Sequence, residues 1–184
     1  MYAEFGEDQW IVDNLKLPES GIYVEVGAAS PTDRSNTAFL RDRGWTGLAI
    51  DGDEYWEPFW QGVQGATFIR QIIHTSPEVN FGRCAAAPVL SRIDPNGAPT
   101  DHTSTLCDLM DIHGITQVDF LSLDCEGQEY EVFLSAGLNF RPTIIIAEFN
   151  TAGIGEDLRL KAHLEHIGYE TVHQTIANFI YVRR

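Results

Sequence analysis

Short apolar runs alternate with segments of helical periodicity along most of the chain. The runs are rich in Val and Ile and end in glycine or acidic residues, which is typical of buried strands in a parallel sheet. Seven strands are expected, at 22–26, 47–51, 66–74, 119–124, 143–149, 169–174 and 178–182. Apolar residues recur at helical spacing between them, which predicts helices at 7–15, 33–44, 54–63, 105–113, 128–136 and 156–167.

The order of these elements predicts an α/β fold. Five strand–helix units in succession indicate a mostly parallel sheet with helices on both faces. The last two strands are expected to form an antiparallel hairpin at one edge. The stretch 75–103 is proline-rich and irregular, with short strands expected at 79–81 and 88–91. It is too short for a core of its own, so we interpret it as an insertion in a single domain spanning 1–184.

Charge and cysteine content narrow the classes of partner. The formal net charge is −15, and such a surface repels phosphate backbones and anionic lipids. A small-molecule or neutral glycan substrate is therefore favoured over nucleic acid or a membrane. Cys84, Cys107 and Cys125 are widely spaced, which favours reduced thiols over a disulfide scaffold or a structural zinc site. No apolar run has transmembrane length and no signal-peptide pattern is present, so we expect a cytoplasmic protein.

Four of the expected strands end in an acidic residue. Ligands of open α/β sheets bind at the carboxyl ends of the strands. In this chain those ends carry Glu25, Asp51, Asp124 and Glu148. Because the ends of parallel strands converge at one edge of the sheet, we expect these carboxyl groups to lie around one binding site.

The first strand is followed by a glycine loop, Glu25-Val26-Gly27-Ala28. A glycine there permits a tight turn and a close approach of the backbone to a ligand. The fingerprint Gly-x-Gly-x-x-Gly is absent, which disfavours NAD or FAD. Asp51, at the end of the next strand, is placed to bind both ribose hydroxyls of an adenosine-containing cofactor. The alternatives are an ordinary strand–helix turn at Gly27 and a helix cap at Asp51.

A second acidic loop follows the fourth strand. Asp124 and Glu126 repel each other unless a cation, a proton or hydrogen-bond donors lie between them. A ligand ammonium, a metal ion or a role as active-site base would each explain the pair. The alternative is that Glu126 caps the next helix and faces solvent. His74, at the end of the third strand, is a further candidate base, since histidine titrates near neutrality.

Seven segments together resemble the FkbM family of methyltransferases. They occur in the family's order and cover nearly the whole chain, and the Ser-Asn-Thr segment and the Asp-x-Glu-Gly loop are the most specific of them. The segments are 4–8 (EFGED), 23–28 (YVEVGA), 35–37 (SNT), 43–47 (RGWTG), 105–109 (TLCDL), 119–127 (DFLSLDCEG) and 146–150 (IAEFN). The chain departs from the family pattern in Glu25, where Asp is more usual, and in Glu4, where glutamine is common.

The resemblance implies a Rossmann-like fold of the class I methyltransferases. It also implies that the protein binds S-adenosylmethionine and methylates a hydroxyl group, often on a sugar or a secondary metabolite. By this resemblance Glu25 and Gly27 line the methionine end of the cofactor, Asp51 holds the ribose, and Asp124 lies near the reacting centre. The full set of expected cofactor-binding residues is Glu25, Gly27, Ala28, Ser35, Asn36, Asp51, Gly52 and Asp124.

Methyl transfer to a hydroxyl requires in-line alignment and removal of the acceptor proton. Our hypothesis is that Asp124 orients the cofactor or acceptor and that Glu126, Glu148 or His74 is the base. No resident metal is expected, and a divalent cation at Asp124 and Glu148 is the alternative that polarises the acceptor. A further alternative is a degenerate domain that binds S-adenosylmethionine or a nucleoside without turnover.

Overall fold

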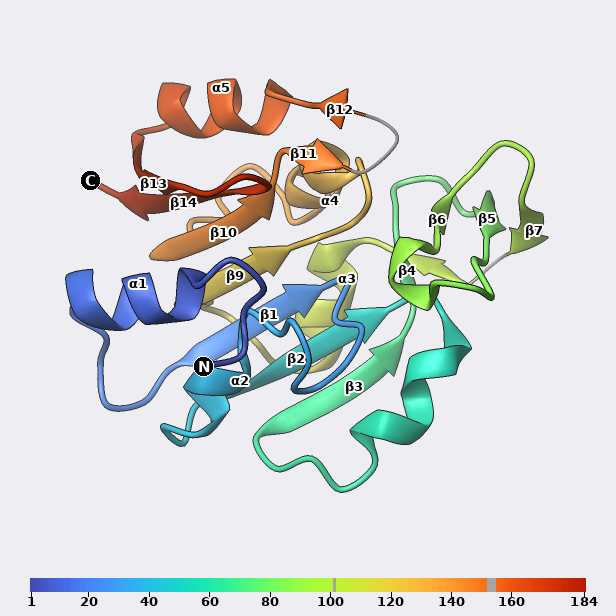
Figure 1. The fold of residues 1–184 in the computed structure, drawn as a ribbon. Helices are drawn as coiled ribbons and strands as arrows, with labels where there is room; N and C mark the ends of the chain where they lie inside the picture. Colours follow the sequence, from blue (N-terminus) through green and yellow to red (C-terminus); the bar gives the residue numbers. More distant parts are fainter. Residues whose placement is uncertain (101, 152–154) are drawn as a thin grey trace.

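One large sheet forms the centre of the molecule (Figure 1). The computed structural model describes residues 1–100, 102–151 and 155–184. The seven strands lie in the order β13-β14-β10-β9-β1-β2-β3. Their bounds are β1 Ile22–Val26, β2 Thr46–Asp51, β3 Ala66–Arg70, β9 Phe120–Leu123, β10 Ile144–Glu148, β13 Tyr169–Gln174 and β14 Asn178–Arg183.

The strand directions agree with the predicted mostly parallel sheet. Neighbouring strands from β3 to β10 are all parallel. Strand β14 is antiparallel to both of its neighbours, β10 and β13. The two closing strands therefore form the expected antiparallel hairpin. Because β14 runs against the others, its first residue lies at the same edge of the sheet as the carboxyl ends of the parallel strands.

Helices cover both faces of the sheet, which explains why its central strands are mostly apolar. On one face, Tyr23 and Phe120 pack with residues of α1 (Glu7–Asn14) and α2 (Ala38–Arg41). On the other face, Val24 and Leu121 pack with residues of three further helices. These are α3 (Leu106–Ile112), α4 (Glu129–Ser135) and α5 (Arg159–His166).

Two predicted helices are wrong in extent or type. The helix expected at 33–44 is reduced to Ala38–Arg41. The Ser35 hydroxyl accepts hydrogen bonds from the backbone N–H groups of Thr37 and Ala38, which holds the preceding segment in a turn. The segment expected as a helix at 54–63 is the 3₁₀-helix η1 (Glu54–Trp60), with Pro58 inside it. Proline removes a backbone donor and disfavours a regular α-helix there.

The third predicted strand divides in two. Strand β3 ends at Arg70, and β4 (Ile72–Ile73) leaves the large sheet to pair with β8 (Thr103–Ser104). The following segment contains a small sheet of order β6-β5-β7, located beyond the carboxyl ends of the central strands in Figure 1. Its strands are β5 Val79–Gly82, β6 Arg92–Ile93 and β7 Ala98–Thr100.

The short strands expected in the insertion have different outcomes. The strand at 79–81 is confirmed as part of β5. The strand at 88–91 is wrong, because Pro88–Leu90 forms a 3₁₀ turn, η2, with proline at its start. Two further short strands, β11 (Asn150–Thr151) and β12 (Gly155–Glu156), pair beside the large sheet.

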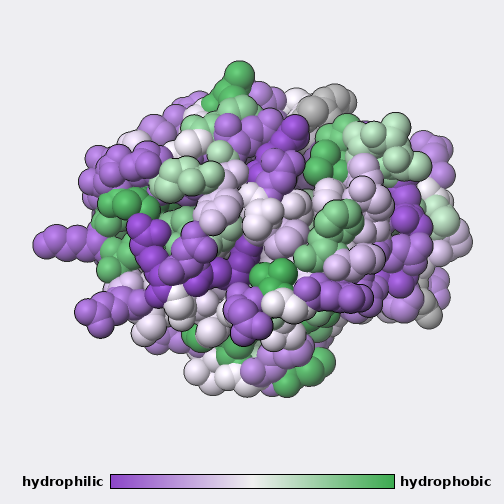
Figure 2. Space-filling view, turned by 60° about the horizontal axis from the view of Figure 1, so that its bottom comes forward, coloured by the Kyte–Doolittle hydropathy of each residue, from purple (hydrophilic) through white to green (hydrophobic). Residues whose placement is uncertain are grey.

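The surface is predominantly hydrophilic on the face shown in Figure 2, where hydrophobic residues occur in separate small groups. Within the described ranges, the longest apolar helical stretch falls short of what a membrane crossing requires. The candidate functional residues lie at the carboxyl edge of the sheet.

Candidate active site

A cavity of about 470 Å³ opens at the carboxyl ends of β1, β2, β9 and β10. This volume lies in the usual range for sites that bind small molecules and cofactors. The four acidic strand ends all line it, as predicted: Glu25, Asp51, Asp124 and Glu148. The N-terminal segment, the small sheet and the β13–β14 turn supply the remaining walls.

The glycine loop after β1 packs directly on the end of β9. Gly27 has a φ of +79°, and a Cβ built there would lie 1.7 Å from the carbonyl oxygen of Asp124. The backbone N–H groups of Gly27 and Ala28 both donate to the carbonyl of Ile50, at 2.9 and 3.0 Å. Only glycine combines this conformation with this contact. The loop is therefore fixed against the two strands that flank β1, which are β2 and β9, and its backbone lines the cavity.

Asp51 organises the loop after β2 with both of its carboxyl oxygens. Its Oδ2 accepts a hydrogen bond from the N–H of Ala29 at 2.9 Å, and its Oδ1 accepts one from the N–H of Asp53 at 2.8 Å. Burial raises the pKa of Asp51 to about 6. Each carboxylate oxygen can accept a second hydrogen bond, so Asp51 can also bind hydroxyl groups of a ligand in the cavity.

Glu25 is buried beside the same loop. The hydroxyl of Thr37 donates to its Oε2 at 2.6 Å, and the guanidinium of Arg41 donates to that hydroxyl at 2.9 Å. Burial raises the pKa of Glu25 to about 7, against the lowering effects of Thr37 and Arg41. Asn36 lines the cavity nearby, and its amide nitrogen donates to the hydroxyl of Ser122 at 3.3 Å. A ligand cation here would favour the ionised form of Glu25.

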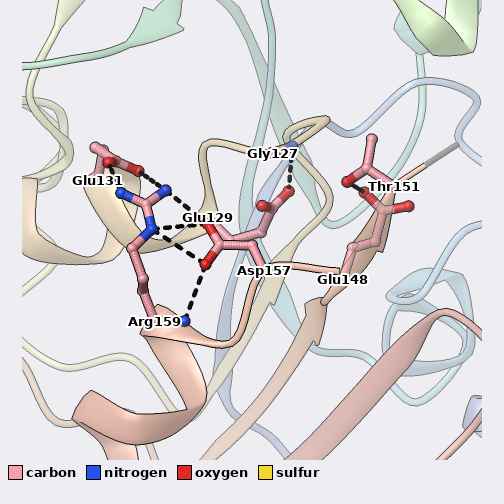
Figure 3. A network of polar contacts seen from close by, with 7 residues as sticks. All are labelled: Gly127, Glu129, Glu131, Glu148, Thr151, Asp157 and Arg159. Atoms are coloured by element: carbon pink, nitrogen blue, oxygen red, sulfur yellow. Dashed lines mark hydrogen bonds and ion pairs between the residues drawn. The ribbon is translucent and has the colours of Figure 1, made fainter. Parts of the chain in front are cut away.

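The loop after β9 holds Glu126 in an unusual position. Glu126 has a φ of 54°, in the left-handed region that residues other than glycine seldom adopt. Glu129 stabilises the loop, because its Oε1 accepts hydrogen bonds from the N–H of Cys125 at 2.7 Å and from the N–H of Gly127 at 3.3 Å (Figure 3). Strained residues of this kind cluster at functional sites.

Glu126 is 8% exposed and lines the cavity. Its Oε2 is buried and has no hydrogen-bond partner in the part of the chain that the structure describes. Burial, together with the charge of Asp124, raises the pKa of Glu126 to about 7. This carboxyl can therefore exchange a proton near neutrality.

Glu148 carries its proton to higher pH than the other carboxyl groups. The hydroxyl of Thr151 donates to its Oε2 at 2.7 Å (Figure 3). Burial raises the pKa of Glu148 to about 9, with Asp124 as the next cause. Burial and nearby carboxyl groups also raise the pKa of Asp124. Glu148 therefore holds its proton more tightly than an exposed glutamate, and in the protonated form it can donate a hydrogen bond.

The cavity brings together most of the residues expected from the sequence. Ala28 and Gly52 line it with the residues described above, whereas Ser35 and His74 do not. Ser35 instead caps the turn before α2. The Nδ1 of His74 accepts a hydrogen bond from the N–H of Ser76 at 2.9 Å. Among the described residues, no group of three or more His, Cys, Asp or Glu side chains is placed to hold a metal ion.

Sequence reasoning missed a buried polar pair, formed by Asn178 at the far end of the cavity and Glu7 behind it. The amide nitrogen of Asn178 donates to Oε1 of Glu7 at 2.7 Å, across 171 positions of sequence. Asn178 lines the cavity and is 6% exposed, and Glu7 is fully buried. In the sequence, Asn178 is marked only as a polar residue at the start of an apolar strand. Its position at the cavity becomes apparent only from the register of β14.

Comparisons with known proteins agree with this geometry. The model of the methyltransferase FkbM domain matches residues 25–171. No curated protein matches the sequence significantly.

Several solved structures resemble the fold, among them the following three. The fibrillarin pre-rRNA processing protein of Methanococcus jannaschii is 13% identical, with a TM-score of 0.54 over 94% of this chain and 72% of that one. A chain of a fibrillarin/Nop5p complex is 14% identical, with a TM-score of 0.54 over 99% and 81%. The precorrin-6y C5,15-methyltransferase of Geobacter metallireducens GS-15 is 12% identical, with a TM-score of 0.52 over 96% and 87%. At these identities the likeness shows the fold alone, which is the predicted Rossmann-like fold of class I methyltransferases.

Proposed function

The chain belongs to the FkbM methyltransferase family, and we propose that it transfers the methyl group of S-adenosylmethionine to a hydroxyl group of a small molecule or glycan. One observation carries the proposal: carboxyl groups from four parallel strands line a single cavity. Such a site attracts a ligand with positive groups, because each buried carboxylate is stabilised by a nearby cation. The cofactor carries two of them, an ammonium and a sulfonium.

The residues at one end of the cavity fit this cofactor. Glu25 and Asn36 offer polar contacts at the end of β1, and the absence of a side chain at Gly27 leaves room for a close approach of the backbone. Asp51 retains acceptor capacity for the two ribose hydroxyls. We assign Glu25, Gly27, Ala28 and Asn36 to the methionine end, and Asp51 and Gly52 to the ribose.

When bound, the cofactor supplies a methyl group made reactive by its sulfonium sulfur. The protein has to align the acceptor oxygen with that methyl group and to take up the acceptor proton. Glu126 is the proposed base, because its pKa of about 7 matches neutral conditions and its Oε2 has no competing partner among the described residues. Protonated Glu148 is suited to donate a hydrogen bond, and Asp124 to orient the reacting groups.

The acceptor is proposed to be neutral or positively charged. The net charge of −15 and the carboxyl groups around the cavity disfavour nucleic acid, anionic lipid and other anionic acceptors. A small molecule or glycan with a hydroxyl group is consistent with the proposed chemistry and, if it is not anionic, with the acidic cavity. We propose that neither nucleic acid nor a membrane is a partner.

Calorimetry on the purified protein tests the proposal. S-adenosylmethionine and its demethylated product, S-adenosylhomocysteine, are each expected to bind at one site, and NAD is expected not to bind. Asp51→Ala is the site variant, and Asp13→Ala on the exposed side of α1 is the matched control. If neither sulfur compound binds the wild-type protein, the proposal is wrong.

A further inference from the structure

Two buried hydrogen-bond acceptors in the cavity lack partners among the residues that the structure describes. They are Oε2 of Glu126 and Oδ1 of Asn178. Both residues line the same cavity, and they are 8% and 6% exposed. Folded proteins satisfy most buried polar atoms, so unpaired acceptors that share a binding cavity indicate groups completed by a ligand.

The orientation of the Asn178 amide is set by its neighbours. Its nitrogen donates to Oε1 of Glu7, which also accepts a hydrogen bond from the hydroxyl of Thr175 at 3.0 Å. The second oxygen of Glu7 accepts from the backbone N–H of Phe5 at 3.1 Å. A carboxylate accepts and an amide nitrogen donates, so this contact assigns the amide nitrogen to the side of Glu7 and the amide oxygen to the opposite side. Glu7 is not a cavity residue, so the oxygen is the end that Asn178 can offer to a ligand.

The sheet register places Asn178 at the end of the cavity opposite the proposed ribose site. Asn178 is paired directly with Glu148 in the antiparallel β10–β14 ladder. Residues so paired carry their side chains on the same face of the sheet, as close neighbours. Strands β10, β9 and β1 separate β14 from β2, where Asp51 lies. At ~4.8 Å per strand, Asn178 and Asp51 are roughly 19 Å apart along the sheet.

We propose that Asn178 and Glu126 each accept a hydrogen bond from the methyl acceptor, which is therefore a neutral molecule with at least two hydroxyl groups. This inference rests on the proposed function and assigns the other end of the same cavity. Glu126 receives the hydroxyl that becomes methylated, and Asn178 receives a second hydroxyl that fixes the orientation. Glu7 is a positioning residue that acts through the Asn178 amide.

The surrounding charges exclude an anionic acceptor. Asp124 and Glu126 line this end of the cavity, and Glu7 lies directly behind Asn178. A carboxylate or phosphate on the acceptor would meet like charge and would bring no donor for the unpaired oxygens. Arg34 and Arg92 also line the cavity, and Arg34 forms an ion pair with Glu4 at 3.6 Å. These two cations face several carboxyl groups, so the balance of charge in the cavity remains acidic.

The test uses the protein saturated with S-adenosylhomocysteine, so that cofactor binding is established first. The probes are the methyl glycosides of glucose, mannose, galactose and rhamnose, with methyl glucuronide as the anionic comparison. Binding is measured by saturation-transfer NMR and by calorimetry. Asn178→Ala is the site variant. Gln174→Ala is the matched control, because Gln174 is exposed on the neighbouring strand β13 and does not line the cavity.

Neutral glycosides are expected to bind and methyl glucuronide is not. Asn178→Ala is expected to weaken the tightest glycoside at least about fivefold, the usual effect of losing a buried hydrogen-bond partner. Gln174→Ala should leave that affinity unchanged, and both variants should bind S-adenosylhomocysteine as the wild type does. Monodeoxy analogues of the tightest glycoside give a readout that needs no variant. One of these analogues should bind the wild-type protein more weakly than the parent glycoside does, by the same factor. The same analogue should bind Asn178→Ala nearly as well as the parent glycoside does.

Two results would overturn the inference while leaving the proposed function intact. One is a protein that binds S-adenosylhomocysteine but no neutral glycoside, or that prefers methyl glucuronide. The other is glycoside binding that Asn178→Ala leaves unchanged. Failure to bind S-adenosylhomocysteine would instead refute the proposed function itself.

Discussion

Gly27 and the carbonyl oxygen of Asp124 are in direct contact, so that a Cβ at position 27 would lie 1.7 Å from that oxygen. The contact joins the loop after β1 to the end of β9, and both segments line the cavity. The backbone rather than a side chain thus sets the distance between the proposed methionine end and the proposed reacting centre.

Gly27→Ala is expected to reduce stability and to abolish cofactor binding. The substitution strains the backbone at a φ of +79° and forces the two loops apart, which together cost about 3 kcal/mol or more. Gly44→Ala is the control, since Gly44 has a φ of +81° and a Cβ there would meet no other atom within 4 Å. It should cost only about 1–2 kcal/mol. Chemical denaturation measures both, and equal losses would contradict the role of the Asp124 contact.

Asp51→Asn is expected to weaken S-adenosylhomocysteine binding about 10- to 100-fold, because an amide has one acceptor oxygen where the carboxylate has two. The Ala29 and Asp53 N–H groups already use one hydrogen bond from each carboxyl oxygen. Asp53→Asn is a suitable control, because Asp53 is buried in the same loop but does not line the cavity. Calorimetry on both variants checks this, and similar affinities would remove Asp51 from the ribose site.

Glu126→Gln is expected to lower kcat by about 10²–10⁴-fold while cofactor affinity is retained. The base acts in its ionised form, so wild-type kcat/KM should rise with pH through about 7, the pKa of Glu126, and then level off. The variant should show no such rise. A parallel measurement on Glu129→Gln separates loss of the base from loss of loop structure, since Glu129 only braces the loop backbone. An unchanged pH profile in Glu126→Gln would exclude it as the base.

The protein without cofactor is expected to be more stable at pH 5.5 than at pH 8. Burial raises the pKa of Glu25 and Glu129 to about 7 and of Glu148 to about 9, from an ordinary value of 4.5. The folded state therefore binds protons more tightly than the unfolded chain. The stability that these groups contribute is fully present below about pH 4.5 and is lost as the pH rises through 7 to 9.

Thermal unfolding across this pH range measures the effect. Glu148→Gln imitates the protonated carboxyl, so it should flatten the upper part of the curve, above pH 7. Glu131→Gln is the comparison, since its partner Arg159 is half exposed and such surface pairs contribute little (Figure 3). A melting temperature that rises from pH 5.5 to pH 8 would refute the expectation.

The sequence predicts the parallel part of the sheet well for a physical reason. Strands covered by helices on both faces are apolar at most positions, so an acidic residue marks where each of them ends. That is why Glu25, Asp51, Asp124 and Glu148 could be expected around one cavity. The prediction fails where local hydrogen bonds compete with a periodic pattern, as at Ser35, whose hydroxyl delays the start of α2.

Other features depend on register and could not be read along the chain. Ile72 and Ile73 continue the apolar pattern of β3, yet they pair with β8 because the chain leaves the sheet at Gln71. The contact between Glu7 and Asn178 requires knowing that β14 is inserted beside β10 in the opposite direction. Neither a spacing nor a composition rule relates two residues so distant in sequence.

The direction of β14 also has a consequence for biosynthesis. The loops around Gly27, Asp51 and Asp124 are made well before Asn178, and the closing hairpin at Tyr169–Arg183 supplies the last wall of the cavity. During translation, a nascent chain that has not yet released this hairpin from the ribosome has the loops of the proposed cofactor site but lacks the proposed acceptor end. That end of the cavity can therefore assemble only after the hairpin has been synthesised.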